Sequence, residues 1–99
     1  MLTKAETYED LYCNFGWDIP DIFNMGVDVC DKHALATPSK PGLIVVDPGR
    51  PTITYTFADL KRLSDKLANL FTAKGLERGE RVGILMSQSV DAAISHVAA

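Results

Sequence analysis

The clearest pattern of apolar positions in this 99-residue chain lies between residues 56 and 75. Apolar side chains recur there at steps of three and four residues, which is the spacing of one face of an α-helix. Thr56 and Asp59 have the spacing of a capping box, and Gly75 is placed to end the helix in a left-handed conformation. The pattern predicts a helix of about 18 residues. Its apolar stripe is Phe57, Leu60, Leu63, Leu67, Leu70 and Phe71.

Two short runs rich in β-branched residues precede this helix, at residues 43–47 and 52–56. A Pro- and Gly-containing turn, Asp47–Pro51, joins them. Two strand-like runs joined by such a turn predict an antiparallel hairpin. Ile53 and Tyr55 then share one face of the second strand, and the threonines lie on the other.

Residues 81–86 (Arg-Val-Gly-Ile-Leu-Met) are apolar without alternation. This pattern is typical of a strand buried on both faces in a parallel sheet. Together with the hairpin and the long helix, it predicts a right-handed βαβ crossover. A last helix follows, with Ser89 as its N-cap and an apolar stripe at Val90, Ala93, Ile94 and Val97. The sequence ends at Ala99, about three turns later, and we expect this stripe to find no cover within the chain.

The region before the hairpin combines an irregular lead-in with a further helix. Residues 1–20 are expected to be irregular or briefly helical and to end at Pro20, which favours extended backbone before it. A helix is predicted from about Asp21 to Ala36, with Asn24 as the cap of its main body and Gly26 as a weak point. Its apolar face would consist of Phe23, Val27, Cys30 and Ala34.

Together these elements predict an α/β fold in the order N-terminal helix, β-hairpin, long helix, buried strand and truncated helix. Residues 1–42 form the lead-in and first helix, and residues 43–99 form the hairpin-helix-strand-helix part. One crossover does not cover both faces of a sheet, and it leaves two sheet edges open. We therefore interpret residues 1–99 as the incomplete opening segment of a larger layered α/β domain.

Composition narrows the class of protein. The chain is 46% apolar and 23% charged, which is near the globular average and argues against wholesale disorder. Its net charge of −3 and pI of about 5.2 argue against broad nucleic-acid binding. The uncharged runs are shorter than the roughly 20 residues of a membrane span.

Acidic and aromatic residues are concentrated at the start of the chain. Residues 1–31 contain seven acids and one lysine (−6), whereas residues 32–99 contain nine bases and six acids (+3). Two interpretations stay open: a solvated acidic segment, or a segment that lies on a basic surface of a larger body. A free aromatic tail is unfavourable in water, so this segment needs a surface to cover. Five of the eight aromatic residues belong to it, namely Tyr8, Tyr12, Phe15, Trp17 and Phe23.

Two cysteines, Cys13 and Cys30, permit one disulfide. The first ten residues contain no apolar leader run and are too acidic for a transit peptide. We expect two free thiols in a reducing compartment, with the cytoplasm as the default.

Cys30 and His33 are three residues apart on one predicted helix, which suits two metal ligands or a nucleophile and its base. No CxxC pair and no further orienting residue accompany them, so a small core cysteine is the favoured interpretation. Asp28 and Asp31 place two carboxylates on one helical side. Acid–base catalysis needs one of them desolvated, and in this polar segment solvated surface acids are favoured.

Three other groups of residues could suggest a hydrolase or a phosphate-binding site, but each lacks a feature that such a site needs. Ser95 and His96 point about 100° apart on a helix, and no GxSxG motif is present. Gly75 and Gly79 close a helix and lead into a strand, which is the reverse of a phosphate loop. Residues 87–89 (Ser-Gln-Ser) do follow a strand and open a helix, but they include no glycine or lysine.

Four sequence patterns resemble, in order, the start of acyl-CoA synthetases of the adenylate-forming (AMP-binding) superfamily, most of all the medium-chain branch. The first is Tyr12-x-x-Phe15-x-Trp17-x-x-Pro20-x-x-Phe23-Asn24, followed by Val27-Asp28. The others are Thr54-Tyr55-Thr56-Phe57-x-x-Leu60, Gly75-Leu76-x-x-Gly79-Glu80-Arg81-Val82, and Leu85-Met86-x-Gln88-Ser89 continued through Ala99.

The resemblance implies an AMP-forming acid–thiol ligase several-fold longer than this chain. Such enzymes join a carboxylate to ATP, release pyrophosphate, and transfer the acyl group to CoA, with Mg²⁺. The family's Ser/Thr/Gly-rich phosphate loop, its ribose-binding acid, its hinge and its C-terminal lysine have no counterpart in these 99 residues. No catalytic, cofactor-binding or metal residue is therefore carried over, and the chain by itself is expected to be inactive.

The resemblance also implies that the remainder of a synthetase chain is the packing partner of this segment. The alternative is a small stand-alone α/β module that binds a protein partner through residues 1–31. Acyl substrate, chain length and oligomeric state stay open.

Overall fold

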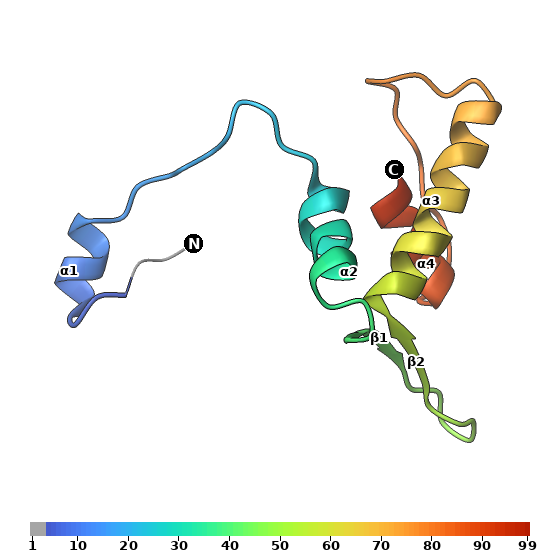
Figure 1. Ribbon diagram of the computed structural model, residues 1–99, viewed down its shortest axis with the longest axis horizontal. Helices are drawn as coiled ribbons and strands as arrows, with labels where there is room; N and C mark the ends of the chain where they lie inside the picture. Colours follow the sequence, from blue (N-terminus) through green and yellow to red (C-terminus); the bar gives the residue numbers. More distant parts are fainter. Residues whose placement is uncertain (1–3) are drawn as a thin grey trace.

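The computed structural model describes residues 4–99, so the first three residues of the acidic segment 1–31 lie outside it. The fold combines helices with a two-stranded antiparallel sheet, which confirms the expected mix of α and β structure (Figure 1). Along the chain the elements are α1 (Tyr8–Cys13), a π-helical turn η1 (Val27–Asp31), α2 (Lys32–Ala36), β1 (Pro41–Val45), β2 (Ile53–Thr56), α3 (Phe57–Ala73) and α4 (Val90–Ala98).

The predicted hairpin is present. β1 and β2 pair antiparallel with Leu43 opposite Tyr55, and the register shifts between Pro41 and Leu43. At the turn the Arg50 amide donates to the Asp47 carbonyl at 3.0 Å, and Gly49 has a φ of +83°. A side chain at that φ would be strained, so glycine suits the turn.

The long helix α3 has the predicted start and end. The Asp59 amide donates to Thr56 Oγ1 at 3.1 Å, and the Thr56 amide donates to Asp59 Oδ2 at 3.2 Å, which completes the capping box. At the other end Gly75 has a φ of +90°, and the Leu76 amide donates to the Phe71 carbonyl at 3.1 Å. This bond is the 6→1 bond of a Schellman motif.

The first predicted helix begins later than expected. Helical structure starts after Asn24, not at Asp21, because Asn24 Oδ1 accepts the Val27 amide at 3.0 Å and so caps the main body. Gly26 is required here by close packing. A Cβ at this position would lie 2.8 Å from the Val97 carbonyl oxygen of α4.

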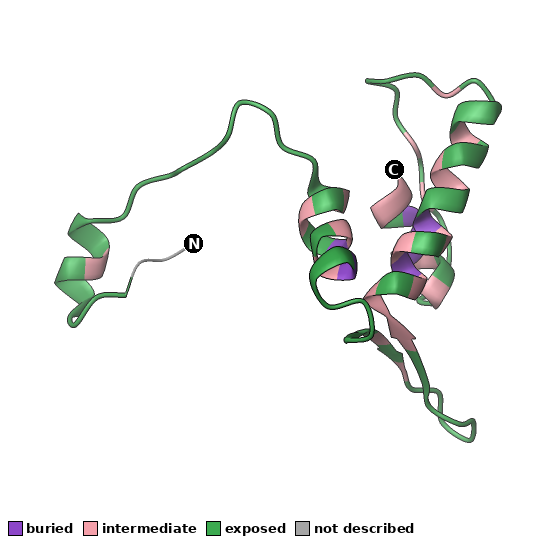
Figure 2. Cartoon of the chain, viewed as in Figure 1, coloured by how far each residue is buried: buried purple, intermediate pink, exposed green. Residues whose placement is uncertain are grey.

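The small core lies where η1, α3 and α4 meet (Figure 2). Cys30, Leu60 and Ile94 are its buried residues. The prediction that the stripe of the last helix would find no cover is therefore wrong, because residues 75–89 return alongside α3 and bring α4 against it (Figure 1). Around the core pack Leu43, Tyr55, Phe57, Leu63, Leu67, Val90 and Val97.

The predicted strand at residues 81–86 does not form within the described part of the chain. Val82 and Ile84 are half-buried, but Leu85 is 100% exposed, so the segment is covered on one side only. The reason is the absence of a neighbour: β1 and β2 pair with each other, and no third strand among residues 4–99 offers main-chain hydrogen bonds. The expected βαβ crossover is accordingly not formed.

The lead-in, defined here as residues 4–24, stands apart from the other elements (Figure 1). It contains the short helix α1, capped by Thr7, and an extended stretch that runs to Asn24. This confirms the expected short helical, otherwise irregular beginning. Most of its length is exposed (Figure 2). Its aromatic residues are among the exposed ones, and Trp17 is 82% exposed.

Candidate functional site

The Cys30 thiol is a core group. It is 1% exposed, and Sγ lies 4.0 Å from the Phe57 carbonyl oxygen. Burial raises the pKa of this thiol, and the nearby Asp31 carboxylate raises it further. A protonated, enclosed thiol is a poor nucleophile and a poor metal ligand, so the favoured interpretation as a small core residue agrees with the structure.

The His33 ring lies on the ring of Phe57, with centroids 5.0 Å apart and planes at 35°. Cys30 and His33 therefore meet different parts of the same residue, the thiol its carbonyl and the imidazole its ring. Within residues 4–99 no three His, Cys, Asp or Glu side chains gather as a possible metal site.

Asp28 and Asp31 have different surroundings. Asp28 forms an exposed ion pair with Lys32 one turn away, as a solvated acid would. Asp31 is only 24% exposed in its side chain and accepts a hydrogen bond from Lys61 Nζ at 2.9 Å. The expectation of a simple surface acid is therefore wrong for Asp31, because α3 folds against η1 and brings Lys61 to it.

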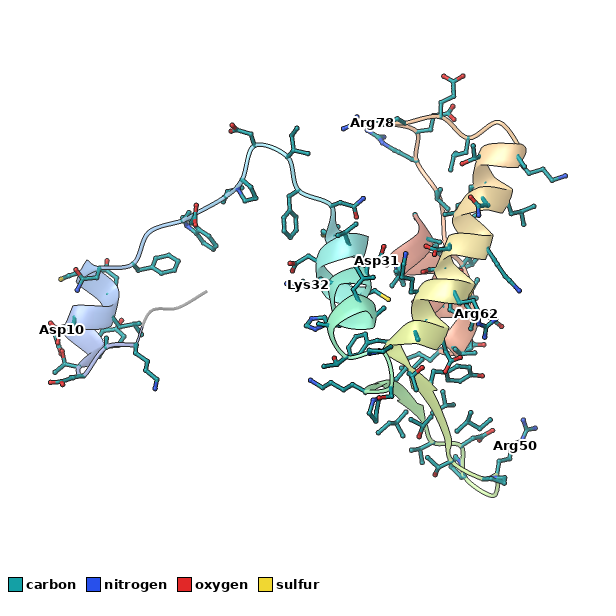
Figure 3. The ribbon with its side chains drawn as sticks, in the orientation of Figure 1. Asp10, Asp31, Lys32, Arg50, Arg62 and Arg78 are labelled. Atoms are coloured by element: carbon teal, nitrogen blue, oxygen red, sulfur yellow. The ribbon has the colours of Figure 1, made fainter. Side chains whose placement is uncertain are left out.

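Lys61 ties η1 to α3. Its ammonium also donates to Asp65 at 3.0 Å, and the hydrogen bonds to Asp31 and Asp65 raise the pKa of Lys61. Figure 3 shows Asp31 on η1 directed toward α3. Sequence periodicity alone does not signal this contact, because Asp31 and Lys61 are far apart along the chain.

The start of α4 borders a hollow of about 420 Å³. Ser89 caps the helix as predicted, and its hydroxyl accepts the Ala92 amide at 3.3 Å. Its walls combine apolar side chains with polar groups from Gln88, Ser89 and His96. The lining residues are Leu43, Ile84, Met86, Gln88, Ser89, Ala92, Ala93 and His96.

Ser95 and His96 are separated by the helix, as their spacing predicts. His96 lines the hollow, whereas Ser95 is buried and donates to the Asp91 carbonyl at 2.7 Å. A serine held by its own helix and directed elsewhere cannot be activated by this imidazole.

The Gly75 and Gly79 region is a pair of turns, as predicted. Both glycines have positive φ, +90° and +94°. The Glu77 amide, the type of group that would hold a phosphate, donates instead to the Glu80 carboxylate at 2.7 Å. An acid already occupies this amide, which opposes binding of another anion.

The candidate residues therefore have structural roles: Ser89 caps a helix, Asp31 and Lys61 form an ion pair between two helices, and Cys30 packs in the core. Among the described residues none forms a nucleophile–base pair with a separate orienting group. No helix in residues 4–99 is long and apolar enough to cross a membrane.

The AMP-binding enzyme family matches residues 30–99, from the core cysteine to the last helix. No solved structure matches the chain significantly.

The chain is also similar to proteins named as coenzyme A synthetases. Acetyl-coenzyme A synthetase 2 of Debaryomyces hansenii is 32% identical over 89 residues, which cover 89% of this chain and 13% of that protein. Mitochondrial acyl-coenzyme A synthetase ACSM3 of Rattus norvegicus is 31% identical over 97 residues, covering 92% of this chain and 17% of the relative. The chain thus spans 13–17% of the length of these two relatives.

Proposed function

Because this chain belongs to the AMP-binding enzyme family, we propose that it is the opening segment of an AMP-forming acyl-CoA synthetase. The observation that carries the proposal is the family match over residues 30–99, which includes the hairpin, α3 and α4. The whole enzyme would convert a carboxylate and ATP to an acyl-adenylate and pyrophosphate, and then transfer the acyl group to CoA.

In that enzyme the residues of this chain would be scaffold. Thr56 and Asp59 fix the start of α3, Gly75 fixes its end, and Leu60 and Ile94 close the core. Thr56, Leu60 and Gly75 are named positions of the patterns that resemble the family, and all five residues shape or pack the backbone. The remainder of the synthetase chain would then cover the exposed side of residues 81–86.

ATP, Mg²⁺ and CoA would be the cofactors and co-substrate of the whole enzyme. We propose that residues outside this chain hold them, because the two amides described above that could face a phosphate are already engaged. Glu80 occupies the turn amide that a phosphate would need, and Ser89 occupies the Ala92 amide at the start of α4. We therefore assign no step of the reaction to the side chains described here.

A direct test uses the purified 99-residue chain with ATP, Mg²⁺ and a carboxylate, either acetate or a longer fatty acid. We expect pyrophosphate release no faster than in a blank without protein. Formation of an acyl-adenylate by the isolated chain would overturn the scaffold assignment. Sequencing of the transcript beyond codon 99 is the second arm, and we expect the frame to continue into a Ser/Thr/Gly-rich loop containing lysine.

The acid substrate and the compartment are also proposals. The relatives are named for acetyl and for acyl groups, which supports a carboxylic acid substrate without fixing its length. We propose a reducing compartment such as the cytoplasm, supported by two free cysteines, one exposed and one buried. Imaging of the tagged chain tests the compartment.

A second candidate function is a stand-alone interaction module, and the exposed aromatic lead-in favours it. A cooperative unfolding transition in a monomeric chain whose reading frame stops at codon 99 would support the module. A frame that runs on would exclude it.

A further inference from the structure

The helix that precedes the hairpin is interrupted by one π-helical turn. Helical structure begins at residue 25, passes through η1 (Val27–Asp31) and continues as α2. The Lys32 amide donates to the Val27 carbonyl, five residues back, whereas an α-helix would use the carbonyl four residues back. Single π turns within α-helices are rare, and many lie at functional sites. The residues around this turn indicate why it forms.

The π turn decides which residue faces α4. A π turn holds one residue more than an α turn, so it displaces every residue on its N-terminal side by one position along the helix. If α2 continued backward as an α-helix, Val27 would occupy the place that Gly26 occupies in the structure. The start of the helix would also turn by about 100° about its axis, the rotation of one α-helical residue. The lead-in, which is attached there, would leave in a different direction (Figure 1).

Helix α4 does not admit Val27 at that place. A Cβ on Gly26 would lie 2.8 Å from the Val97 carbonyl oxygen, which belongs to the backbone of α4. A valine there carries two further carbon atoms on its Cβ and would conflict with α4 more severely. A residue without a side chain fits beside this carbonyl, and the π turn brings a glycine to it.

The sequence pattern independently favours the α register. Val27, Cys30 and Ala34 recur at the spacing of one α-helical face. In the structure Cys30 and Ala34 are buried, whereas Val27 is 48% exposed. The π turn therefore takes Val27 away from the face that its spacing predicts.

We propose that residues 25–36 have two registers, π and α, and that docking of α4 selects the π register, because only that register presents Gly26 to the Val97 carbonyl. The fold thereby couples the position of α4 to the direction of the lead-in. This inference does not depend on the proposed enzymatic role.

The ion pair between Asp31 and Lys61 is a rival cause of the π turn, since it also holds η1. It does not distinguish the registers, because Asp31 lies at the C-terminal end of the turn, next to α2, and keeps its place in both. Lys61→Met should therefore keep the π turn. Loss of the π turn in Lys61→Met would assign it to the ion pair and overturn the proposal.

The decisive variant is Val27→Gly, in which the α register also presents a residue without a side chain to α4. Because the α-helix is otherwise the favoured form, we expect the Lys32 amide to change its acceptor from the carbonyl of residue 27 to that of residue 28. Scalar couplings across the hydrogen bond, measured by NMR on the isotope-labelled 99-residue chain, identify the acceptor. A Lys32 amide that still donates to residue 27 in this variant would overturn the proposal.

The matched control is Val29→Gly, at another exposed valine of the same turn. This variant lowers the helix propensity of the turn equally, but Val27 still blocks the α register. The Lys32 amide should therefore keep the Val27 carbonyl as its acceptor. A change of acceptor in Val29→Gly would show that any glycine in the turn shifts the register, and would contradict selection by α4.

A spin label on Cys13, the exposed thiol of the lead-in, tests the coupling to the lead-in. The label broadens the NMR signals of nearby amides in the body. We expect the set of broadened amides to change in Val27→Gly and to stay the same in Val29→Gly. The same set in the original chain and in both variants would contradict the coupling.

Discussion

The lead-in and the body of the molecule, residues 25–98, both contain many apolar side chains, yet among the described residues the buried ones all lie in the body. In the lead-in Tyr8, Tyr12 and Trp17 are 72–82% exposed, whereas Leu60 and Ile94 of the body are 8% and 7% exposed. The body arranges its apolar positions on stripes that face one another across η1, α3 and α4. Burial follows from complementary faces within the chain, and aromatic content alone does not produce it.

The largest contrast is expected between two leucines. Leu60→Ala removes a buried side chain from the core and should lower the free energy of unfolding by about 2–4 kcal/mol. Leu11→Ala in α1 should change it by no more than about 0.5 kcal/mol. Urea denaturation at concentrations where the chain is monomeric measures both. Equal losses would show that the lead-in belongs to the same cooperative unit.

Substitution of two glycines also compares the packed body with the exposed lead-in. Gly26→Ala places a Cβ against the Val97 carbonyl oxygen at 2.8 Å, so α4 must shift, at a cost of about 1–3 kcal/mol. A Cβ at Gly16 would meet no atom within 4 Å, and Gly16→Ala should be neutral to within about 0.5 kcal/mol. Thermal unfolding of the two variants tests this. A neutral Gly26→Ala would contradict the close packing of Gly26 on α4.

Two helix caps come next. Thr56→Ala removes the cap of α3 and should cost about 1 kcal/mol, whereas Thr7→Ala removes the similar cap of α1 and should leave unfolding of the body unchanged. Urea denaturation of both variants makes the comparison, and an equal loss in Thr7→Ala would contradict the independence of α1.

The cap of α3 also predicts a pH dependence. The hydrogen bond from the Thr56 hydroxyl lowers the pKa of Asp59 below its ordinary 3.8. The resulting stabilisation is present above that value and is lost as the pH falls through the lower, folded pKa. Thr56→Ala should therefore flatten the acid limb of a stability–pH curve. If the acid limb is unchanged in Thr56→Ala, the loss of stability at low pH comes from groups other than Asp59.

The reactivity of the two thiols should differ between the lead-in and the body, and this difference can be measured without destabilising the chain. Cys13 in the lead-in is exposed, whereas Cys30 is buried and its pKa is raised. A thiol reagent added to the dilute native chain should label Cys13 rapidly and Cys30 only as the body unfolds. Cys13→Ser leaves Cys30 as the single thiol and provides the control. Rapid labelling of Cys30 in this variant would contradict the core.

Local signals predicted most of the fold. The capping box at Thr56 and Asp59, the stripe of α3, Gly75 and the Ser89 cap all act within a few residues and appear as expected. Predictions that depend on distant segments failed. Residues 81–86 have strand composition, but a strand also needs a neighbour, and the cover of α4 depends on where a loop returns the chain.

In the candidate sites, too, the sequence predicts local features but not contacts between distant residues. The core role of Cys30 and the separation of Ser95 from His96 follow from composition and helical geometry. The tie between Asp31 and Lys61 joins partners 30 residues apart, so no periodic pattern signals it. Only the folded chain places them together.

Strand β2 passes into α3 without a linker, since Thr56 is both the last residue of one and the cap of the other. The first-turn amides of Phe57 and Ala58 donate to the Lys40 and Pro38 carbonyls, each at 3.1 Å, which fastens the junction from the opposite side. The hairpin is therefore joined directly to the helix, and main-chain hydrogen bonds hold the two in a fixed orientation. A force applied at its tip near Arg50 would be transmitted to α3 as a tilt, instead of being absorbed by a hinge.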